Sequence, residues 1–302
     1  LIVRRRGSGS YLTGRLAAPH QNTIGILIPD SQEPFWAALL GAARGVLEEN
    51  GFETRTFHTG NQIAREREIL CGLLKEPPRA LLVRGCKTAL PNPNLDLYRR
   101  LLSQNCPAVF LGSCYPALDG CACIRVNNYG AGARLADALI AQGHTAAAGF
   151  FLADDLEETE RFLGFAEAMQ EAGFPIPDSR IVWYTSREQK LLLENRDVPL
   201  LSPASEEALS SCTAAVFSSD IPAWRLTRAL PRSGRRVLSE MTIAVFGDPY
   251  LKHLRTAAPL TFTLRPREMG TQAARAVLAR LRGLPAVLPE IEWELTRPRP
   301  LL

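Results

Sequence analysis

The sequence predicts an α/β protein in which two parallel, doubly wound sheets form two lobes with a ligand cleft between them. Apolar runs of strand length alternate with amphipathic segments of helix length along most of the 302 residues. This alternation is typical of parallel sheets with helices on both faces. Several helical segments stop at a glycine, which is a common helix terminator. A count of about ten strands exceeds the usual size of one sheet and indicates two.

The stretch 22–51 holds the clearest strand–loop–helix unit. Its apolar run 24–28 ends at Pro29 and is typical of a strand buried on both faces. Pro34 suits the first turn of a helix, and Gly51 supplies the stop after a series of apolar residues at helical spacing. The loop between strand and helix opens at the carboxyl end of the strand, where open α/β sheets bind ligands.

The other elements follow from the same two periodicities. Strands are predicted at 24–29, 53–58, 79–84, 107–112, 123–126, 145–151, 180–184, 213–218, 242–247 and 260–264. Helices are predicted at 34–50, 63–75, 95–105, 130–142, 156–172, 205–211, 221–230 and 267–282. The polar, proline-containing stretch 185–204 is interpreted as a surface excursion.

The N-terminus does not belong to this pattern. Residues 1–12 are typical of a strand, a turn and a strand, with a basic and Gly/Ser-rich tip formed by Arg4, Arg5, Arg6, Gly7, Ser8 and Gly9. Such a tip suits contact with DNA phosphates or a minor groove; the alternative is a flexible basic tail. Residues 13–22 are interpreted as a linker.

Composition narrows the function classes. A net charge of +4 on 302 residues does not by itself imply a nucleic-acid partner, and no apolar run is long enough to span a membrane. The seven cysteines are irregularly spaced and the four histidines are scattered, so we expect reduced thiols in a cytoplasmic protein, with no metal site and no cofactor. The N-terminus lacks an initiator Met and the charge order of a signal peptide, which suggests a piece of a longer protein.

Motifs of common α/β enzymes are missing. The first strand is not followed by G-x-G-x-x-G, and neither a P-loop lysine motif nor a G-x-S-x-G elbow occurs. The acidic pairs Asp154-Asp155 and Glu157-Glu158 have no partner that the sequence places, so they are interpreted as an acidic bias at a helix N-terminus. We therefore do not expect an enzyme.

Seven local motifs follow one another in an order and spacing that resemble one family. They are Pro34-Phe35-Trp36, Val126-Asn127-Asn128-Tyr129-Gly130-Ala131, Gly143-His144, Arg161-Phe162-Leu163-Gly164-Phe165, the run 215–220, the run 242–248, and Leu260-Thr261 with Arg265-Pro266 and Met269-Gly270. Over residues 23–298 they resemble the effector-binding core of the LacI/GalR repressors, which share a two-lobed, type I periplasmic-binding-protein-like fold with periplasmic sugar-binding proteins. The N-terminal strands and tip look like the wing that ends a GntR-type winged helix. That combination is similar to regulators of the arabinose-repressor type.

The resemblance implies a ligand-responsive, homodimeric transcription regulator, acting as a repressor, whose operator-binding domain is mostly absent from this chain. The implied domains are 1–12 for a winged-helix remnant, 13–22 for a linker and 23–300 for the effector-binding domain. Lobe 1 would comprise 23–126 and 259–285, and lobe 2 would comprise 127–258 and 286–300. The alternative is a transport-type periplasmic sugar-binding protein, which would carry no wing.

The candidate ligand-binding residues combine this resemblance with the chemistry of sugar sites, which need an aromatic face and convergent polar groups. They are Glu33, Phe35, Trp36, Arg84, Lys87, Arg161, Ser219, Asp220, Asp248 and Arg265. At least one of Phe35 and Trp36 should meet the cleft, because neighbours on a helix cannot face the same way. Arg161 occupies the Arg of the R-x-x-G-F motif and resembles the Arg that reaches a ligand oxygen.

Four positions depart from the family's usual residues: Arg84, Ser219, Gly247 and Arg265. Three arginines, at positions 84, 161 and 265, would then surround one cleft, and arginine forks suit carboxylate or phosphate. This favours an anionic effector such as a sugar acid or a sugar phosphate. The alternative is that Glu33, Asp248 or Asp220 pairs with the arginines and that the ligand is a neutral pentose.

Overall fold

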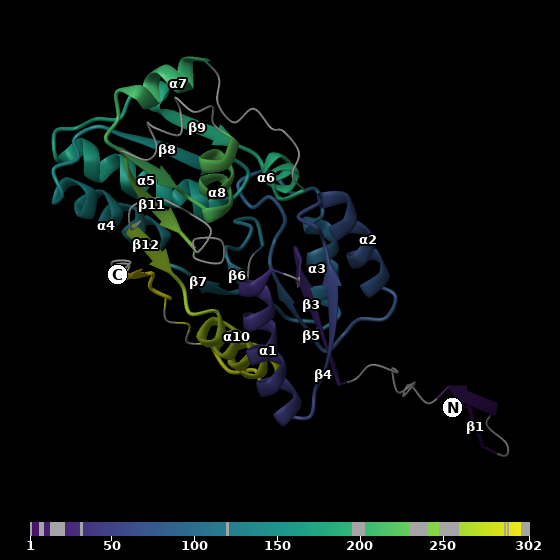
Figure 1. The fold of residues 1–302 in the computed structure, drawn as a ribbon. Helices are drawn as coiled ribbons and strands as arrows, with labels where there is room; N and C mark the ends of the chain where they lie inside the picture. Colours follow the sequence, from purple (N-terminus) through teal and green to yellow (C-terminus); the bar gives the residue numbers. More distant parts are fainter. Residues whose placement is uncertain are drawn as a thin grey trace.

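The chain folds into two α/β lobes that lie side by side in the computed structural model (Figure 1). The structure describes residues 2–5, 9–12, 22–30, 33–118, 121–194, 203–229, 241–247, 260–286, 288 and 290–296. Each lobe is a sheet covered by helices on both faces, as the βαβ alternation predicted.

The first lobe is a five-stranded parallel sheet with the order β4-β3-β5-β6-β7. Its strands are β3 (Thr23–Ile28), β4 (Glu53–His58), β5 (Ala80–Val83), β6 (Ala108–Gly112) and β7 (Ala122–Arg125). Its helices are α1 (Pro34–Glu49), α2 (Ile63–Leu73) and α3 (Leu95–Ser103), joined from the far end of the chain by α10 (Pro266–Leu281). Successive buried residues face opposite sides: Leu82 packs toward α1 and α10, whereas Leu81 and Val83 pack toward α2 and α3.

The second lobe is a six-stranded sheet with the order β13-β12-β11-β10-β8-β9. Its strands are β8 (Ala147–Leu152), β9 (Ile181–Tyr184), β10 (Ala214–Phe217), β11 (Thr242–Phe246), β12 (Leu260–Thr263) and the antiparallel β13 (Glu294–Thr296). Helices α4 (Asn128–Ile140) and α5 (Leu156–Glu171) cover one face. The short helix η1 (Asp178–Arg180) leads into β9, and α6 (Ser186–Leu193), α7 (Pro203–Ser210) and α8 (Asp220–Ala229) lie on the other side of the sheet.

Each strand and helix that the sequence predicted after residue 22 has a counterpart in the structure. Among the described residues, three elements were missed: α6, within the stretch interpreted as a surface excursion, the short helix η1 and β13. The predicted lobe limits were also wrong at β12, which was expected in the first lobe with 259–285. It pairs with β11 in the second sheet, because the apolar Phe262 continues that lobe's core and packs on Phe246 with ring centroids 5.2 Å apart. After β12, α10 packs on the first sheet and on α1, and Ile291 forms a bridge with Val126 just after β7.

The N-terminal strands form an antiparallel hairpin, as predicted. Strand β1 (Ile2–Arg5) pairs with β2 (Gly9–Leu12), and Arg5 lies opposite Gly9. Of the candidate DNA-contacting residues, Arg4 and Arg5 lie in β1 and Gly9 in β2, while the tip residues Arg6, Gly7 and Ser8 lie outside the described residues. Their contact with DNA stays a prediction.

Glycines bring two helix pairs into close contact. A Cβ atom on Gly164 of α5 would overlap the carbonyl oxygen of Tyr129 in α4, and one on Gly132 of α4 would overlap the carbonyl oxygen of Arg161. Gly270 of α10 meets the carbonyl oxygen of Leu39 in α1 in the same way. The glycines of the R-x-x-G-F and Met-Gly motifs therefore set the helix spacing in each lobe.

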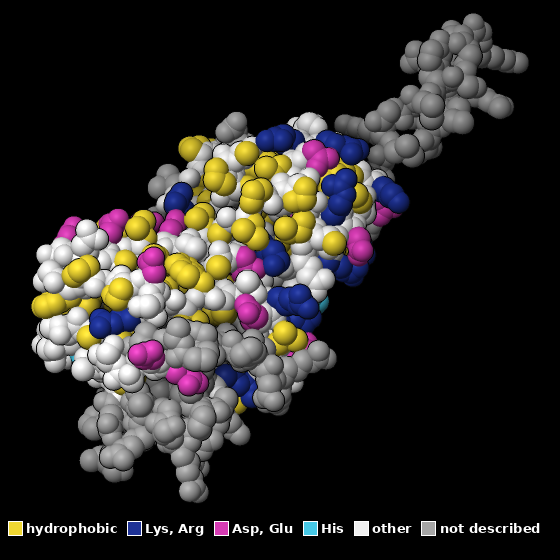
Figure 2. All heavy atoms as spheres, turned by 90° about the horizontal axis from the view of Figure 1, so that it is seen from above, with side chains coloured by type: hydrophobic (Ala, Val, Ile, Leu, Met, Phe, Trp, Pro, Cys, Tyr) yellow, Lys and Arg dark blue, Asp and Glu magenta, His cyan; other side chains and the backbone are white. Residues whose placement is uncertain are grey.

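The surface of the described residues is mixed in character. In the view of Figure 2, acidic and basic side chains are interspersed and hydrophobic side chains lie between them. Within the described part of the chain, no helix is both long enough and apolar enough to pass through a bilayer.

Candidate ligand-binding cleft

A cavity of about 530 Å³ lies between the two lobes, within the size range of small-molecule sites. It opens at the carboxyl ends of strands from both sheets: Asp30 follows β3, Arg84 follows β5, Ser219 follows β10 and Gly247 follows β11. This is the position where open α/β sheets bind ligands.

Both aromatic candidates line the cleft. Phe35 and Trp36 lie in the first turn of α1, half-buried, with their rings edge-to-face at 5.1 Å between centroids. They pack against the main core and also reach the cavity. On the opposite side, Phe246 and Trp293 add two more aromatic rings. These faces can stack against the apolar surface of a sugar ring.

Arg161 lies on α5 in a buried network inside the cleft. Its Nη1 donates to Oδ1 of Asn128 at 2.9 Å, and its Nη2 lies 3.4 Å from Oε1 of Glu158. The guanidinium lies over the rings of Phe246 and Trp293, 5.2 Å from each centroid. Among the described residues, its buried Nε has no hydrogen-bond acceptor, so this nitrogen is a donor that a ligand oxygen could satisfy after a small shift.

Glu158 anchors the same network to the strand ends of the second sheet. Its carboxylate accepts hydrogen bonds from the backbone N–H of Leu152 at 3.0 Å and from the hydroxyl of Ser218. Burial raises the pKa of Glu158 to about 7, although the charge of Arg161 opposes this shift. From the sequence, Glu158 was interpreted only as part of an acidic bias at a helix N-terminus, and it was not among the candidate ligand-binding residues.

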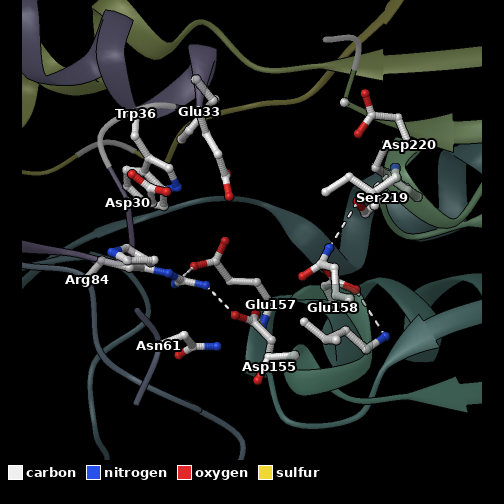
Figure 3. A pocket seen from close by; sticks show the side chains of 18 of the residues that line it. Asp30, Glu33, Trp36, Asn61, Arg84, Asp155, Glu157, Glu158, Ser219 and Asp220 are labelled. Carbon is white, nitrogen blue, oxygen red and sulfur yellow. Dashed lines mark hydrogen bonds and ion pairs between the residues drawn. The ribbon is translucent and has the colours of Figure 1, made fainter. Parts of the chain in front are cut away.

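Arg84 crosses from the first lobe to the second (Figure 3). Its Nη2 lies 2.5 Å from Oδ2 of Asp155, and its Nη1 pairs with the carboxylate of Glu157. Asp155 also caps α5 by accepting from the backbone N–H of Glu157 at 3.0 Å. The guanidinium is therefore neutralised inside the protein by Asp155 and Glu157, one residue from each of the two acidic pairs whose partner could not be predicted from the sequence.

Two further cations do not line the cleft as the sequence analysis expected. Lys87 turns away and pairs with Asp154, Nζ to Oδ2 at 2.8 Å. Arg265 points outward from the start of α10, with 64% of its side chain exposed, and pairs with Glu268 at 3.6 Å and with Glu294. Glu294 lies on β13, the strand that the sequence did not reveal. The expectation of three arginines around the cleft was therefore wrong.

The acidic candidates lie at opposite sides of the cavity. Glu33 precedes α1, and Asp220 begins α8 in the other lobe. Burial, together with the charges of Asp30 and Asp220, raises the pKa of Glu33 to about 7. Ser219 accepts from Nε2 of Gln189 at 3.3 Å. Asp248 lies outside the described residues.

Several lining residues were not among the sequence candidates. They are Asp30, Asn61, Asp155, Glu157, Glu158, Gln189, Lys190, Phe246 and Trp293. Position at a strand's carboxyl end could have indicated Asp30, and the acidic pairs could have been assigned to the cleft. Gln189 and Lys190 lie on the unpredicted α6, and no sequence signal pointed to Trp293. Among the described residues, no cluster of His, Cys, Asp and Glu could hold a metal ion.

Comparisons with known proteins agree with this architecture. A family model described as periplasmic binding proteins and sugar binding domain of LacI family matches residues 21–194, and one described as periplasmic binding protein-like domain matches 136–299. The arabinose metabolism transcriptional repressor of Geobacillus stearothermophilus is 30% identical over 283 residues, which are 92% of this chain and 76% of the relative.

Solved structures share the fold at low sequence identity. A periplasmic binding protein/LacI transcriptional regulator from Alkaliphilus metalliredigens, complexed with D-xylulofuranose, superposes with a TM-score of 0.73 at 17% identity, over 93% of this chain and 100% of that one. The Cra regulator of Pseudomonas putida, in complex with fructose 1-phosphate, gives a TM-score of 0.73 at 18% identity, over 92% and 99% of the two chains.

Proposed function

The chain belongs to the family of periplasmic binding proteins and LacI-type sugar-binding domains, and on that premise we propose that it is the effector-binding part of a ligand-responsive, DNA-binding transcription repressor. The observation that carries the proposal is the cleft itself. Its walls come from strand ends of both lobes and bring aromatic rings together with polar donors and acceptors, which is the composition that a small polyhydroxylated effector requires. Two relatives that this chain matches over about three quarters of their length are transcriptional repressors, which supports a regulator over a transport-type binding protein.

The cleft supports an effector that carries no net negative charge. Of the arginines that the sequence placed around the cleft, Arg84 is held by Asp155 and Glu157 and Arg265 points away, so neither is available to pair with an anionic sugar. Inserting a further anion beside these carboxylates would be repulsive at short range. Arg84 and Arg265 pair within the protein with Asp155, Glu157, Glu268 and Glu294, whereas the alternative drawn from the sequence named Glu33, Asp248 or Asp220 as the partners.

Regulation would follow from the relative position of the lobes. An effector that contacts both walls binds one lobe arrangement more tightly than another, and it shifts the population toward that arrangement. In a homodimer, that shift would change the spacing of two DNA-binding domains. Residues 1–12 would be the end of a winged helix, contacting DNA through Arg4, Arg5, Arg6, Gly7, Ser8 and Gly9, and 13–22 would link it to the effector domain.

The remaining parts of the proposal are a cytoplasmic location, no enzymatic activity and no cofactor. The test uses the natural protein with its complete DNA-binding domain. Its affinity for operator DNA, selected from random duplexes, is measured with and without a sugar that stabilises the present chain. We expect the sugar to change the affinity at least tenfold, and Arg161→Ala to remove the response while DNA binding itself persists. A sugar that stabilises the chain without any effect on DNA affinity would contradict the proposal.

A further inference from the structure

Polar contacts join the two lobes across one side of the cleft, in addition to the chain segments that cross between them. The guanidinium of Arg84, in the loop after β5, holds the carboxylates of Asp155 and Glu157 at the start of α5 (Figure 3). The Glu157 carboxylate reaches the end of β6, where a Cβ atom on Gly112 would overlap it. The second lobe therefore inserts its own anionic groups among the strand ends of the first.

Residues further along the same loop extend this contact. Nζ of Lys87 lies 2.8 Å from Oδ2 of Asp154. The backbone N–H of Leu156 donates to Oγ1 of Thr88 at 3.0 Å, and the backbone N–H of Ala89 donates to the carbonyl oxygen of Asp154 at 3.4 Å. A single desolvated ion pair can contribute little net stability, but here two ion-paired cations and two backbone hydrogen bonds act at one interface.

Both sides of this interface are held in place by their own lobe. In the first lobe, Nη1 of Arg84 also donates to the carbonyl oxygen of Leu111 at 3.3 Å and to Oγ of Ser113 at 3.4 Å. In the second lobe, the carboxylate of Asp154 accepts from the backbone N–H of Ser186 at 2.9 Å and from its hydroxyl at 2.6 Å. Side chains that are already ordered lose little conformational entropy when the lobes meet. The contact therefore needs no ligand to arrange it.

The same contact leaves room for an effector. Arg84, Asp155 and Glu157 lie in the wall of the cavity of about 530 Å³, so making the contact does not use up the space in the cleft. We infer that the protein's own contacts between the loop after β5 and the N-terminus of α5 hold the lobes together in the absence of effector. This goes beyond the proposed function and does not depend on what the effector is. It sets the lobe arrangement from which an effector has to shift the population.

The test is hydrogen exchange, resolved to single amides, on the present chain after it has been unfolded, dialysed free of small molecules and refolded. The amide of Leu156 is the most direct probe. It begins α5, and a first-turn N–H has no acceptor within its own helix, whereas its acceptor here, Thr88, belongs to the other lobe. We expect this amide and that of Ala89 to exchange at least about tenfold more slowly than unstructured amides.

Removing the charges of one side should open the contact. The double variant Asp155→Asn with Glu157→Gln keeps the side-chain shapes and a residue suited to the N-cap, but it leaves Arg84 without its anions. We expect the two interlobe amides to exchange about tenfold faster than in the parent, and the radius of gyration from small-angle scattering to rise. Glu171→Gln, at the exposed end of α5, should change neither.

Slow exchange of the amides within α4, which lies in the second lobe, shows in each protein that the lobes are folded. The measurement on the parent decides even if the double variant does not fold. Rapid exchange of the Leu156 and Ala89 amides in the ligand-free parent would overturn the inference. Unchanged exchange and an unchanged radius of gyration in a folded double variant would overturn it as well. Either result would leave the proposed function standing, because that function requires only that an effector changes the affinity for DNA.

Discussion

Arg84 and Asp155 join the two lobes across one side of the cleft, with Nη2 and Oδ2 2.5 Å apart. Neither side chain is more than 14% exposed. Two neighbouring contacts also join the lobes: Lys87 pairs with Asp154, and the backbone N–H of Leu156 donates to Oγ1 of Thr88 at 3.0 Å. The loop after β5 and the N-terminus of α5 therefore form one interlobe contact, which we call the Arg84 bridge.

The Arg84 bridge predicts a large loss of stability on truncation. Arg84→Ala would leave Asp155 and Glu157 buried without their cation, and breaking such a buried pair costs about 3–5 kcal/mol. Arg84→Lys should recover only part of this, because a lysine cannot hold two carboxylates with a planar fork. Urea denaturation measures both. Arg65→Ala is the control, since its pair with Glu68 is more than half exposed and should contribute less than about 1 kcal/mol. Equal effects of Arg84→Ala and Arg65→Ala would contradict the bridge.

Gly164 should tolerate no side chain. An alanine there would meet the carbonyl oxygen of Tyr129, so α4 and α5 would have to separate and Arg161, one turn away on α5, would move with them. We expect a loss of about 1–3 kcal/mol, as for other overpacked sites, and weaker effector binding. Gly45→Ala is the matched control, because a Cβ at that helical glycine contacts nothing within 4 Å. Thermal unfolding of both variants measures the loss of stability. A Gly164→Ala protein with an unchanged unfolding temperature would refute the close contact.

Glu66 holds a buried polar network in the first lobe. Its fully buried carboxylate accepts from the side chains of Asn92 at 2.7 Å, Asn94 at 2.9 Å and Tyr98 at 2.8 Å. Glu66→Ala removes the shared acceptor and strands three buried donors, so we predict a loss of about 3 kcal/mol or more. Glu68→Ala, two residues on and exposed, should be nearly neutral. Chemical denaturation of the two variants compares them directly, and similar midpoints would rule out this role of Glu66.

Stability should fall as pH rises through neutrality. The pKa of Glu33 is raised from an ordinary 4.5 to about 7, so the folded state holds this proton more tightly than the unfolded state. Its contribution is fully present below about pH 4.5 and is lost as the pH rises through 7. Glu33→Gln should therefore be more stable than the parent at about pH 8, on the order of 1–3 kcal/mol, and lose less stability between about pH 5 and 8. Urea midpoints across this range measure the difference; parallel curves for the two proteins would contradict the raised pKa.

Most elements of both lobes could be predicted because the order of apolar and polar residues in each is typical of a buried strand or of an amphipathic helix. Buried parallel strands are continuous apolar runs, and helices such as 34–50 show apolar residues at helical spacing. The run 260–264 was recognised as a strand, yet no local pattern says which sheet it joins. Likewise β13 is short, with all three residues exposed, and it carries no apolar signal of its own.

The cleft was only partly predictable for the same reason. Residues that follow strands in sequence, such as Glu33, Trp36 and Asp220, lie in it because strand ends meet at one edge of each sheet. The partners of Arg84 come from the other lobe, 71 and 73 positions away, and depend on how the lobes face each other. The charge balance of the cleft, and with it the expectation of an anionic effector, could not be judged before that arrangement was known.

The central claim is that a carbohydrate-like effector binds between the lobes, and thermal unfolding of the present chain with a panel of neutral, amino and acidic sugars tests it most directly. A ligand at one hundred times its Kd stabilises the folded state by about 2.7 kcal/mol. We expect such a stabilisation for at least one neutral or amine-bearing sugar, and we expect Trp36→Ala to abolish it. Stabilisation by sugar acids alone, or stabilisation that persists undiminished in Trp36→Ala, would contradict it.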